Sequence, residues 1–114
     1  MVPRQLTARE IAVIRTAIEK AAMQPLAPGL LDQIESLRVI GRCDCGCDSV
    51  DFVADDPQNP SRLFAHGTGK TPAGGDVGII IWGNALGVTG IEVYDLGAGD
   101  DDIRLPVKDS IRPW

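Results

Sequence analysis

The chain has 114 residues, of which 44% are hydrophobic and 24% are charged, and its formal net charge is −5. This length fits a single domain, residues 1–114. The longest apolar run, Ile79-Ile80-Ile81-Trp82, is far shorter than the ~20 residues that a transmembrane helix needs. The composition therefore predicts one globular domain and no contact with the interior of a membrane.

Charge is distributed unevenly along the chain. Residues 1–42 carry six basic and four acidic side chains, residues 43–102 carry two and eleven, and residues 103–114 carry three and one. The acidic middle repels phosphate, so nucleic acid is excluded as its partner. The same charge attracts a cation or a basic protein surface. A solvated acidic rim that keeps the protein soluble is the simpler interpretation.

The first residues, Met1-Val2-Pro3-Arg4-Gln5, lack the apolar stretch of a signal peptide. A cytoplasmic location is therefore expected, where thiols stay reduced. The odd number of cysteines, three, agrees with this, since a secreted disulfide framework would leave one thiol over.

A first helix is predicted over about residues 8–23. Thr7 is a good N-cap, and Glu10, three residues later, completes a capping box. An apolar stripe at helical spacing follows, formed by Ile11, Ile14 and Ile18. Pro25 prevents the helix from continuing.

A second, shorter helix is predicted over about residues 30–37. Pro28-Gly29 precedes it and interrupts the chain. Apolar residues then recur at helical spacing, at Leu30, Leu31, Ile34 and Leu37. Two helices with a short Pro-containing connection are expected to form a hairpin or an elbow.

After residue 37 the hydrophobic pattern changes from helical to strand-like. Strands are predicted at about residues 38–43, 49–54, 63–66, 77–82 and 88–95. Residues 67–75 hold four glycines and a proline, so a mobile loop is expected there. The prediction is an α+β fold, with two N-terminal helices packed on one face of a mostly antiparallel sheet of about four to five short strands.

The last two predicted strands form a hairpin with two different faces. If Gly83–Gly87 is the whole loop, Ile79 faces Ile91 and Val77 faces Val93 on the core side. The opposite face then carries Ile80, Trp82, Val88 and Tyr94. An exposed apolar patch of this kind often marks an interface. Trp114 is the candidate to cover it instead, and a register slip of one residue would exchange the two faces.

Three thiols lie within five residues, at Cys43, Cys45 and Cys47. Zinc prefers thiolate and imidazole ligands in a tetrahedron. The cluster supplies three ligands, and His66, the only histidine, is the candidate for the fourth, which makes zinc the candidate cofactor. A regular strand would hold these thiols too far apart for one ion, so a metal site requires the chain to curl at Gly46.

Other interpretations of the cysteines stay open. Asp44 or Asp48 could replace His66 as an oxygen ligand, and cysteine often serves as a small buried hydrophobe at a tight turn. A nucleophilic or redox role would need a stabilised thiolate. Nearby aspartates disfavour a thiolate by like-charge repulsion, and only Arg42 acts in the opposite direction.

Two segments carry a family resemblance, and their sequences are Val39-Ile40-Gly41-Arg42-Cys43-Asp44-Cys45-Gly46-Cys47-Asp48-Ser49-Val50 and Gly90-Ile91-Glu92-Val93-Tyr94. Together they resemble a family of small uncharacterised bacterial proteins, in which a C-x-C-G-C segment precedes a hairpin ending in an L/I-E-V-Y strand. The resemblance covers about residues 38–96. It implies a bacterial cytosolic α+β domain without a known activity, and it directs attention to Cys43, Cys45, Cys47, Glu92 and Tyr94.

No serine–histidine–acid set is recognisable, and no catalytic residues are predicted. The leading hypothesis is a non-enzymatic domain that binds another protein or a second copy of itself through the apolar sheet face. A zinc-binding protein and a thiol redox protein are the alternatives.

Overall fold

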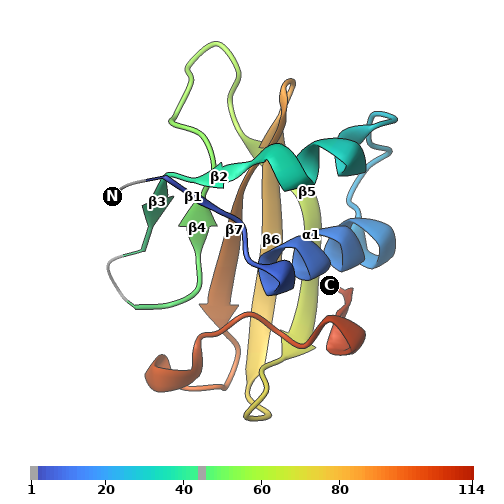
Figure 1. Cartoon of the computed structure of the whole chain (residues 1–114). Helices are drawn as coiled ribbons and strands as arrows, with labels where there is room; N and C mark the ends of the chain where they lie inside the picture. Colours follow the sequence, from blue (N-terminus) through green and yellow to red (C-terminus); the bar gives the residue numbers. More distant parts are fainter. Residues whose placement is uncertain (1–2, 44–45) are drawn as a thin grey trace.

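The computed structural model describes residues 3–43 and 46–114 of the chain (Figure 1). Its elements are β1 (Arg4–Gln5), α1 (Ala8–Ala21), the 3-10 helix η1 (Leu30–Ser36), β2 (Arg38–Val39), β3 (Gly41–Arg42), β4 (Val50–Asp51), β5 (Arg62–Lys70), β6 (Asp76–Asn84), β7 (Gly87–Asp95), the 3-10 helices η2 (Asp100–Asp102) and η3 (Lys108–Ser110), and β8 (Arg112–Pro113). Among these residues no helix is long and apolar enough to cross a membrane.

One antiparallel sheet of six strands, in the order β3-β4-β7-β6-β5-β8, forms the framework, and α1 lies across one of its faces (Figure 1). Strands β1 and β2 form a separate small hairpin-like pair. The predicted α+β class and the antiparallel sheet are confirmed. The predicted pair of helices is wrong, because residues 30–36 form a 3-10 helix and α1 is the one α-helix of the described residues.

The start of α1 follows the predicted capping box. The Thr7 hydroxyl accepts a bond from the Glu10 amide at 3.1 Å, and the Glu10 carboxylate accepts one from the Thr7 amide at 2.8 Å. Arg4 adds two bonds to the same carboxylate, at 2.9 and 3.0 Å. The helix ends at Ala21, because Ala22 turns to an extended conformation and bridges to Ala65 in β5.

Acidification is expected to remove the stability that Glu10 contributes. Burial, the largest single influence, raises the pKa of this carboxyl, but the bonds from Arg4 and Thr7 together hold its pKa below the ordinary value. Such a group stabilises the fold above its unfolded pKa, and the contribution is lost as the pH falls through the folded pKa. The stability difference between wild type and Glu10→Gln is therefore expected to shrink from about pH 7 to about pH 3 in urea denaturation. Glu19→Gln, an exposed position on the same helix, is the control, and an equal pH effect there would contradict the assignment.

The register of the β6–β7 hairpin differs from the predicted one by two residues. Ile79 pairs with Val93 and Ile81 with Ile91, because β6 continues to Asn84 and only two residues form the turn. A shift of two leaves every side chain on its face, since side chains alternate with a period of two. The predicted core face of this hairpin is therefore confirmed.

Val88 is the exception, and its predicted position on the outer face is wrong. Trp82 pairs with Gly90, but the next pair is Gly83 with Val88, so Thr89 is an extra residue in β7. A bulge of one residue reverses the alternation beyond it. Val88 therefore joins the core at 4% exposure, on the side of α1 and η1.

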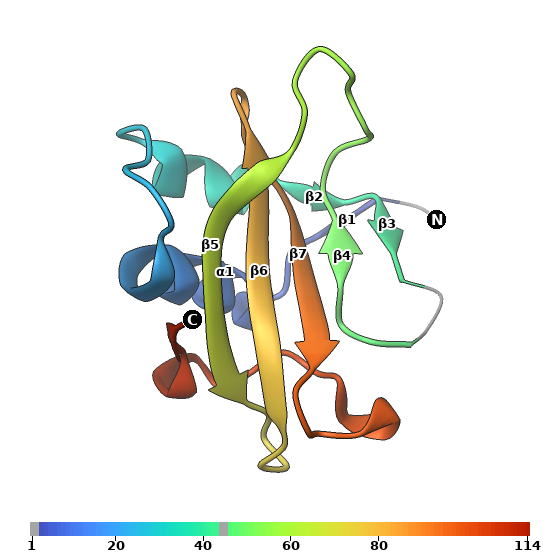
Figure 2. The same cartoon turned by 180° about the vertical axis from the view of Figure 1, so that it is seen from behind.

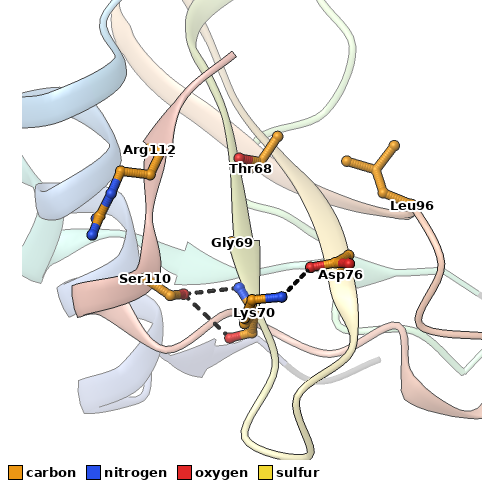
Figure 3. Close-up of a pocket in the computed structure, with 7 residues that line it drawn as sticks. All are labelled: Thr68, Gly69, Lys70, Asp76, Leu96, Ser110 and Arg112. Atoms are coloured by element: carbon orange, nitrogen blue, oxygen red, sulfur yellow. Dashed lines mark hydrogen bonds and ion pairs between the residues drawn. The ribbon is translucent and has the colours of Figure 1, made fainter.

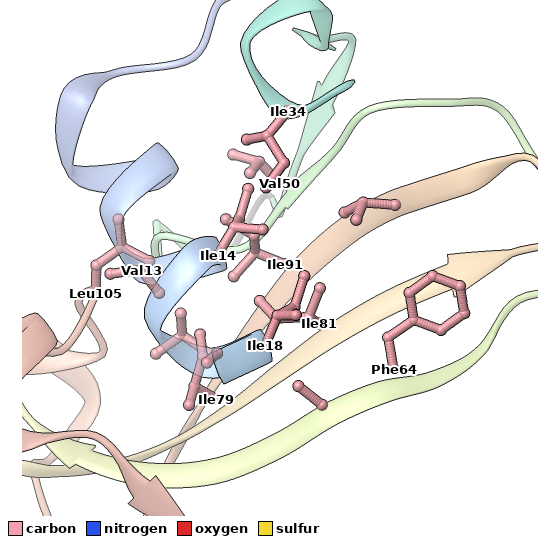
Figure 4. Close-up of a cluster of buried hydrophobic side chains, with 14 of the residues drawn as sticks. Val13, Ile14, Ile18, Ile34, Val50, Phe64, Ile79, Ile81, Ile91 and Leu105 are labelled. Carbon is pink, nitrogen blue, oxygen red and sulfur yellow. The ribbon is translucent and has the colours of Figure 1, made fainter. Parts of the chain in front are cut away.

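The core lies between α1, η1 and the inner face of the sheet (Figure 4). Its fully buried members with the largest side chains include Ile14, Ile34, Ile79, Ile81 and Ile111. The apolar stripe of α1 supplies Val13, Ile14, Ala17 and Ile18. The predicted stripe is thus confirmed at Ile14 and Ile18, whereas Ile11 only packs at its margin.

Residues 67–70, predicted as part of a mobile loop, are the second half of β5. Their glycines serve close packing. A Cβ on Gly67 would lie 2.5 Å from the Arg112 carbonyl oxygen, and one on Gly69 would lie 2.6 Å from the Pro106 ring. The segment is glycine-rich because other chain segments press against its edge and its inner face.

The predicted strands at residues 38–43 and 49–54 are shorter than expected. The first divides into β2 and β3, which belong to different sheets, and the second is reduced to Val50–Asp51. Just before β4, the Ser49 hydroxyl extends the pairing with β7, because it accepts from the Val93 amide at 2.9 Å and donates to the Val93 carbonyl at 3.3 Å. The sheet therefore has more and shorter edge strands than the sequence pattern indicates.

The free edge of β5 is closed by two segments that are far apart in the chain. Close to the end of α1, the Met23 amide donates to the Phe64 carbonyl at 2.9 Å. Further along β5, β8 pairs with Gly67 and Thr68, and the Trp114 amide donates to the His66 carbonyl at 3.1 Å.

Candidate binding face

The face of β5, β6 and β7 that points away from α1 has no second layer over it, and we call it the outer face. Figure 2 looks onto it, and no helix or strand of the described residues covers the three long strands. Four ring side chains gather there, namely His66, Trp82, Tyr94 and Trp114.

Three of the rings form one cluster. A hydrogen bond of 2.5 Å joins His66 Nε2 to the Tyr94 hydroxyl, and the His66 ring stacks on Trp114 with centroids 4.5 Å apart and planes 8° from parallel. Trp114 nevertheless remains 64% exposed. Burial, followed by the charge of Glu92, raises the pKa of Tyr94, so this phenol stays protonated and able to donate at neutral pH.

A second pair lies beside this cluster. The Trp82 indole nitrogen donates to Glu92 Oε1 at 3.1 Å. Ile80 separates the two groups, because it pairs with His66 on one side and with Glu92 on the other. Its 9% exposure shows that the surrounding side chains cover much of it. The polar ends of Trp82 and Tyr94 are thus held in place while parts of their rings face solvent.

Gly78 explains the position of Tyr94. It pairs with Tyr94 across the sheet, and a Cβ on Gly78 would overlap the Tyr94 ring. The ring therefore lies flat over the β6 backbone and reaches His66 on β5. A glycine within a strand often marks such a close approach.

Pockets lie at both ends of the outer face. The pocket beside the β5–β6 turn, which we call the lower pocket, has a volume of about 570 Å³ and is lined by residues including Thr68, Lys70, Asp76 and Leu96 (Figure 3). Lys70 and Asp76 form an ion pair of 2.6 Å within it. In Figure 3 the Arg112 guanidinium points away from this pair. The ion pair leaves the lower end of the face with little net charge.

The pocket at the opposite end, which we call the upper pocket, has a volume of about 250 Å³. Its lining includes Trp82 and three aspartates, Asp51, Asp55 and Asp56. Bonds from the Asn59 side chain and the Gln58 amide lower the pKa of Asp56, so its carboxylate stays ionised. Neither these three aspartates nor Glu92 forms an ion pair with any of the described residues. The upper half of the outer face is therefore both aromatic and acidic.

The predicted zinc set is not assembled around His66. His66 is on β5, while Cys47 precedes β4, and β6 and β7 separate those two strands. Three strand spacings amount to about 14 Å, far more than two ligands of one ion allow. No group of three potential ligands occurs in the part of the chain that the structure describes. Cys45 lies outside that part, so a site made by the three cysteines stays a prediction.

Cys47 itself matches the buried-turn interpretation of the cysteine segment. Its side chain is 9% exposed, and its Sγ lies 3.4 Å from the Ser49 hydroxyl that pairs with β7. Gly46 has a φ of 86°, a left-handed conformation that favours glycine, so the chain does curl where the metal interpretation required it. Cys47 and Asp48 also line a cavity of about 480 Å³ with Arg4, Arg9 and Arg42.

Sequence reasoning missed His66 at the outer face, and it did not predict the strand that brings Trp114 there. The alternation of side chains predicted Trp82, Tyr94 and Ile80 on one face, but not that β5 would bring His66 beside them. The residues around Trp114 show no pattern that predicts a strand, because the position of Trp114 follows from the pairing of β8 with β5.

Comparison with protein-family models, with curated proteins and with solved structures finds no match for this chain. The family resemblance of the cysteine segment therefore stays a prediction, and the functional argument depends on the geometry of the site.

Proposed function

We propose that the protein is a binding domain whose outer face takes up a basic segment of another protein. One observation carries the proposal: Trp82 and Tyr94 are half-buried and present parts of their rings on the outer face, among carboxylates that have no ion-pair partner in the described residues. Aromatic faces attract lysine and arginine side chains through cation–π interactions, most strongly at tryptophan.

The arrangement favours a cationic partner over a neutral one. Glu92 lies next to the Trp82 ring, and Asp51, Asp55 and Asp56 line a pocket together with that ring. A lysine or arginine placed over the indole would therefore meet carboxylates at its charged end and the ring along its methylene chain. Complementary charge of this kind increases the rate of association and selects against acidic partners.

The same charge argues against self-association through this face. Two copies packed face to face with their upper ends together would place the aspartates of one upper pocket against acidic side chains of the other, and like charges in contact destabilise a complex. A monomer is therefore expected in sedimentation velocity at low salt. A dimer that Trp82→Ala dissociates would contradict this and would restore the second copy as the partner.

The proposal is tested by titrating the whole chain with hexalysine that is acetylated at its N-terminus only, and by following tryptophan fluorescence. Hexalysine is expected to bind and hexaglutamate to leave the signal unchanged, and added salt is expected to weaken the complex because it screens exposed charges. Trp82→Ala is expected to weaken binding by about tenfold or more, as loss of a central aromatic contact does.

Leu86→Ala is the matched control. Leu86 is a large apolar residue that is 72% exposed at the tip of the β6–β7 hairpin, away from the outer face. Equal weakening in the two variants, or binding of hexaglutamate as tight as that of hexalysine, would refute the proposed function.

A further inference from the structure

A further hollow lies on the helix side of the molecule and shares no residue with the outer face. It is a groove of about 330 Å³ between α1, the turn after β5 and the segment before η3. Its walls are apolar, formed by Ala12, Val13, Pro72, Pro106 and Val107. Val13 and Pro106 are almost fully buried at its floor, whereas Val107 is 42% exposed at its rim.

Two cations, Arg9 and Lys108, stand at this groove, and none of the described residues that line it is acidic. The Arg9 guanidinium donates to the Leu105 carbonyl at 2.8 Å, which holds it against the groove and leaves its other N–H groups available. Neither cation takes part in an ion pair within the described residues. The groove is therefore electropositive in a molecule that is acidic overall.

Small-molecule sites share this composition. They are concave, mostly apolar, about 300–1,000 Å³ in volume, and carry a few polar groups that fix the orientation of the ligand. The apolar walls select a hydrocarbon chain, and the two cations select an anionic head group. A planar carboxylate suits the guanidinium of Arg9, which presents its donors as a fork.

We propose that this groove binds a free aliphatic carboxylate, with its chain along Val13 and Val107 and its head group between Arg9 and Lys108. This site is independent of the outer face, since none of its residues belongs to β5, β6 or β7. Loss of hexalysine binding and loss of carboxylate binding are therefore separate results.

The test is an NMR titration of the whole chain with octanoate, octylamine and octanol. Octanoate is expected to shift the methyl signals of Ala12, Val13 and Val107, and octylamine is expected to bind at least about tenfold more weakly. Absence of octanoate binding up to about 10 mM, or equal affinities for octanoate and octylamine, would overturn the proposal. An acidic-apolar peptide, acetyl-Leu-Leu-Asp-amide, that binds more tightly than octanoate would assign the groove to a protein partner and would also overturn it.

Variants separate the two parts of the site. Lys108→Gln is expected to weaken octanoate about tenfold without weakening octanol, whereas Ala12→Phe fills the groove and is expected to weaken both. Lys20→Gln, an exposed lysine on the same helix but outside the groove, is the matched control for charge. Unchanged octanoate affinity in both Lys108→Gln and Ala12→Phe would show that the ligand binds elsewhere.

Discussion

Replacing Ile81 by alanine is expected to lower the free energy of unfolding by about 2–5 kcal/mol, the usual loss for a large buried aliphatic side chain. Ile81 has no exposed surface and lies at the centre of the core, between α1 and the sheet (Figure 4). Its removal leaves a cavity that the surrounding strands cannot close, because β6 is paired on both sides. Urea denaturation followed by circular dichroism measures the loss.

Two further variants make this measurement specific. Ile81→Val keeps most of the side chain and is expected to cost about 0.5–1.5 kcal/mol. Ile80→Ala removes the same atoms from the next residue, which points to the outer face and does not belong to the main core. A loss for Ile80→Ala as large as that for Ile81→Ala would show that the outer face is a second core rather than a binding surface.

Replacing Gly67 by alanine is expected to separate β8 from β5. The new Cβ would lie 2.5 Å from the Arg112 carbonyl oxygen and 3.3 Å from the Ala21 side chain, so the backbone of β8 must move. Overpacking of this kind costs about 1–3 kcal/mol. Because β8 also places Trp114, the stacking on His66 is expected to be lost, and the ring-current shifts of the His66 protons in NMR spectra report it.

Gly41→Ala is the matched control for this substitution. Gly41 also lies in a strand that pairs at an edge of the sheet, but a Cβ there would meet only the Asp51 side chain at an ordinary 3.6 Å. It is expected to leave the His66 signals unchanged. Intact His66–Trp114 stacking in Gly67→Ala would mean that β8 is not held by close contact with β5.

The elements predicted best are those whose residues interact locally. The capping box of Thr7 and Glu10 fixes the start of α1 through contacts three residues apart, and an apolar run identifies the buried middle of β6. The predicted hairpin register was in error by two residues, yet the faces were right because an even shift preserves them. The one-residue bulge at Thr89 was not predictable, and it moved Val88 to the other face.

The elements predicted worst are those whose character depends on distant residues. Glycines at positions 67 and 69 resemble a loop in the sequence, but β8 and Pro106 require them within a strand. In the same way, the sequence offers His66 only as a candidate zinc ligand, whereas the pairing of β5 with β6 brings it to Tyr94 on the outer face. A single sequence shows which residue is a glycine or a histidine, but not which segment will lie against it.

The closing of the β5 edge also bears on how the protein avoids aggregation. Strands β5, β6 and β7 alone would present long unpaired edges, which are templates for pairing with other chains. Two segments that are far apart in the sequence, Ala22-Met23 and β8, cover one of these edges, while β4 and Ser49 cover the other. A newly made chain is therefore exposed to edge-to-edge association until β8 has paired with β5, and local fraying of β8 reopens that route.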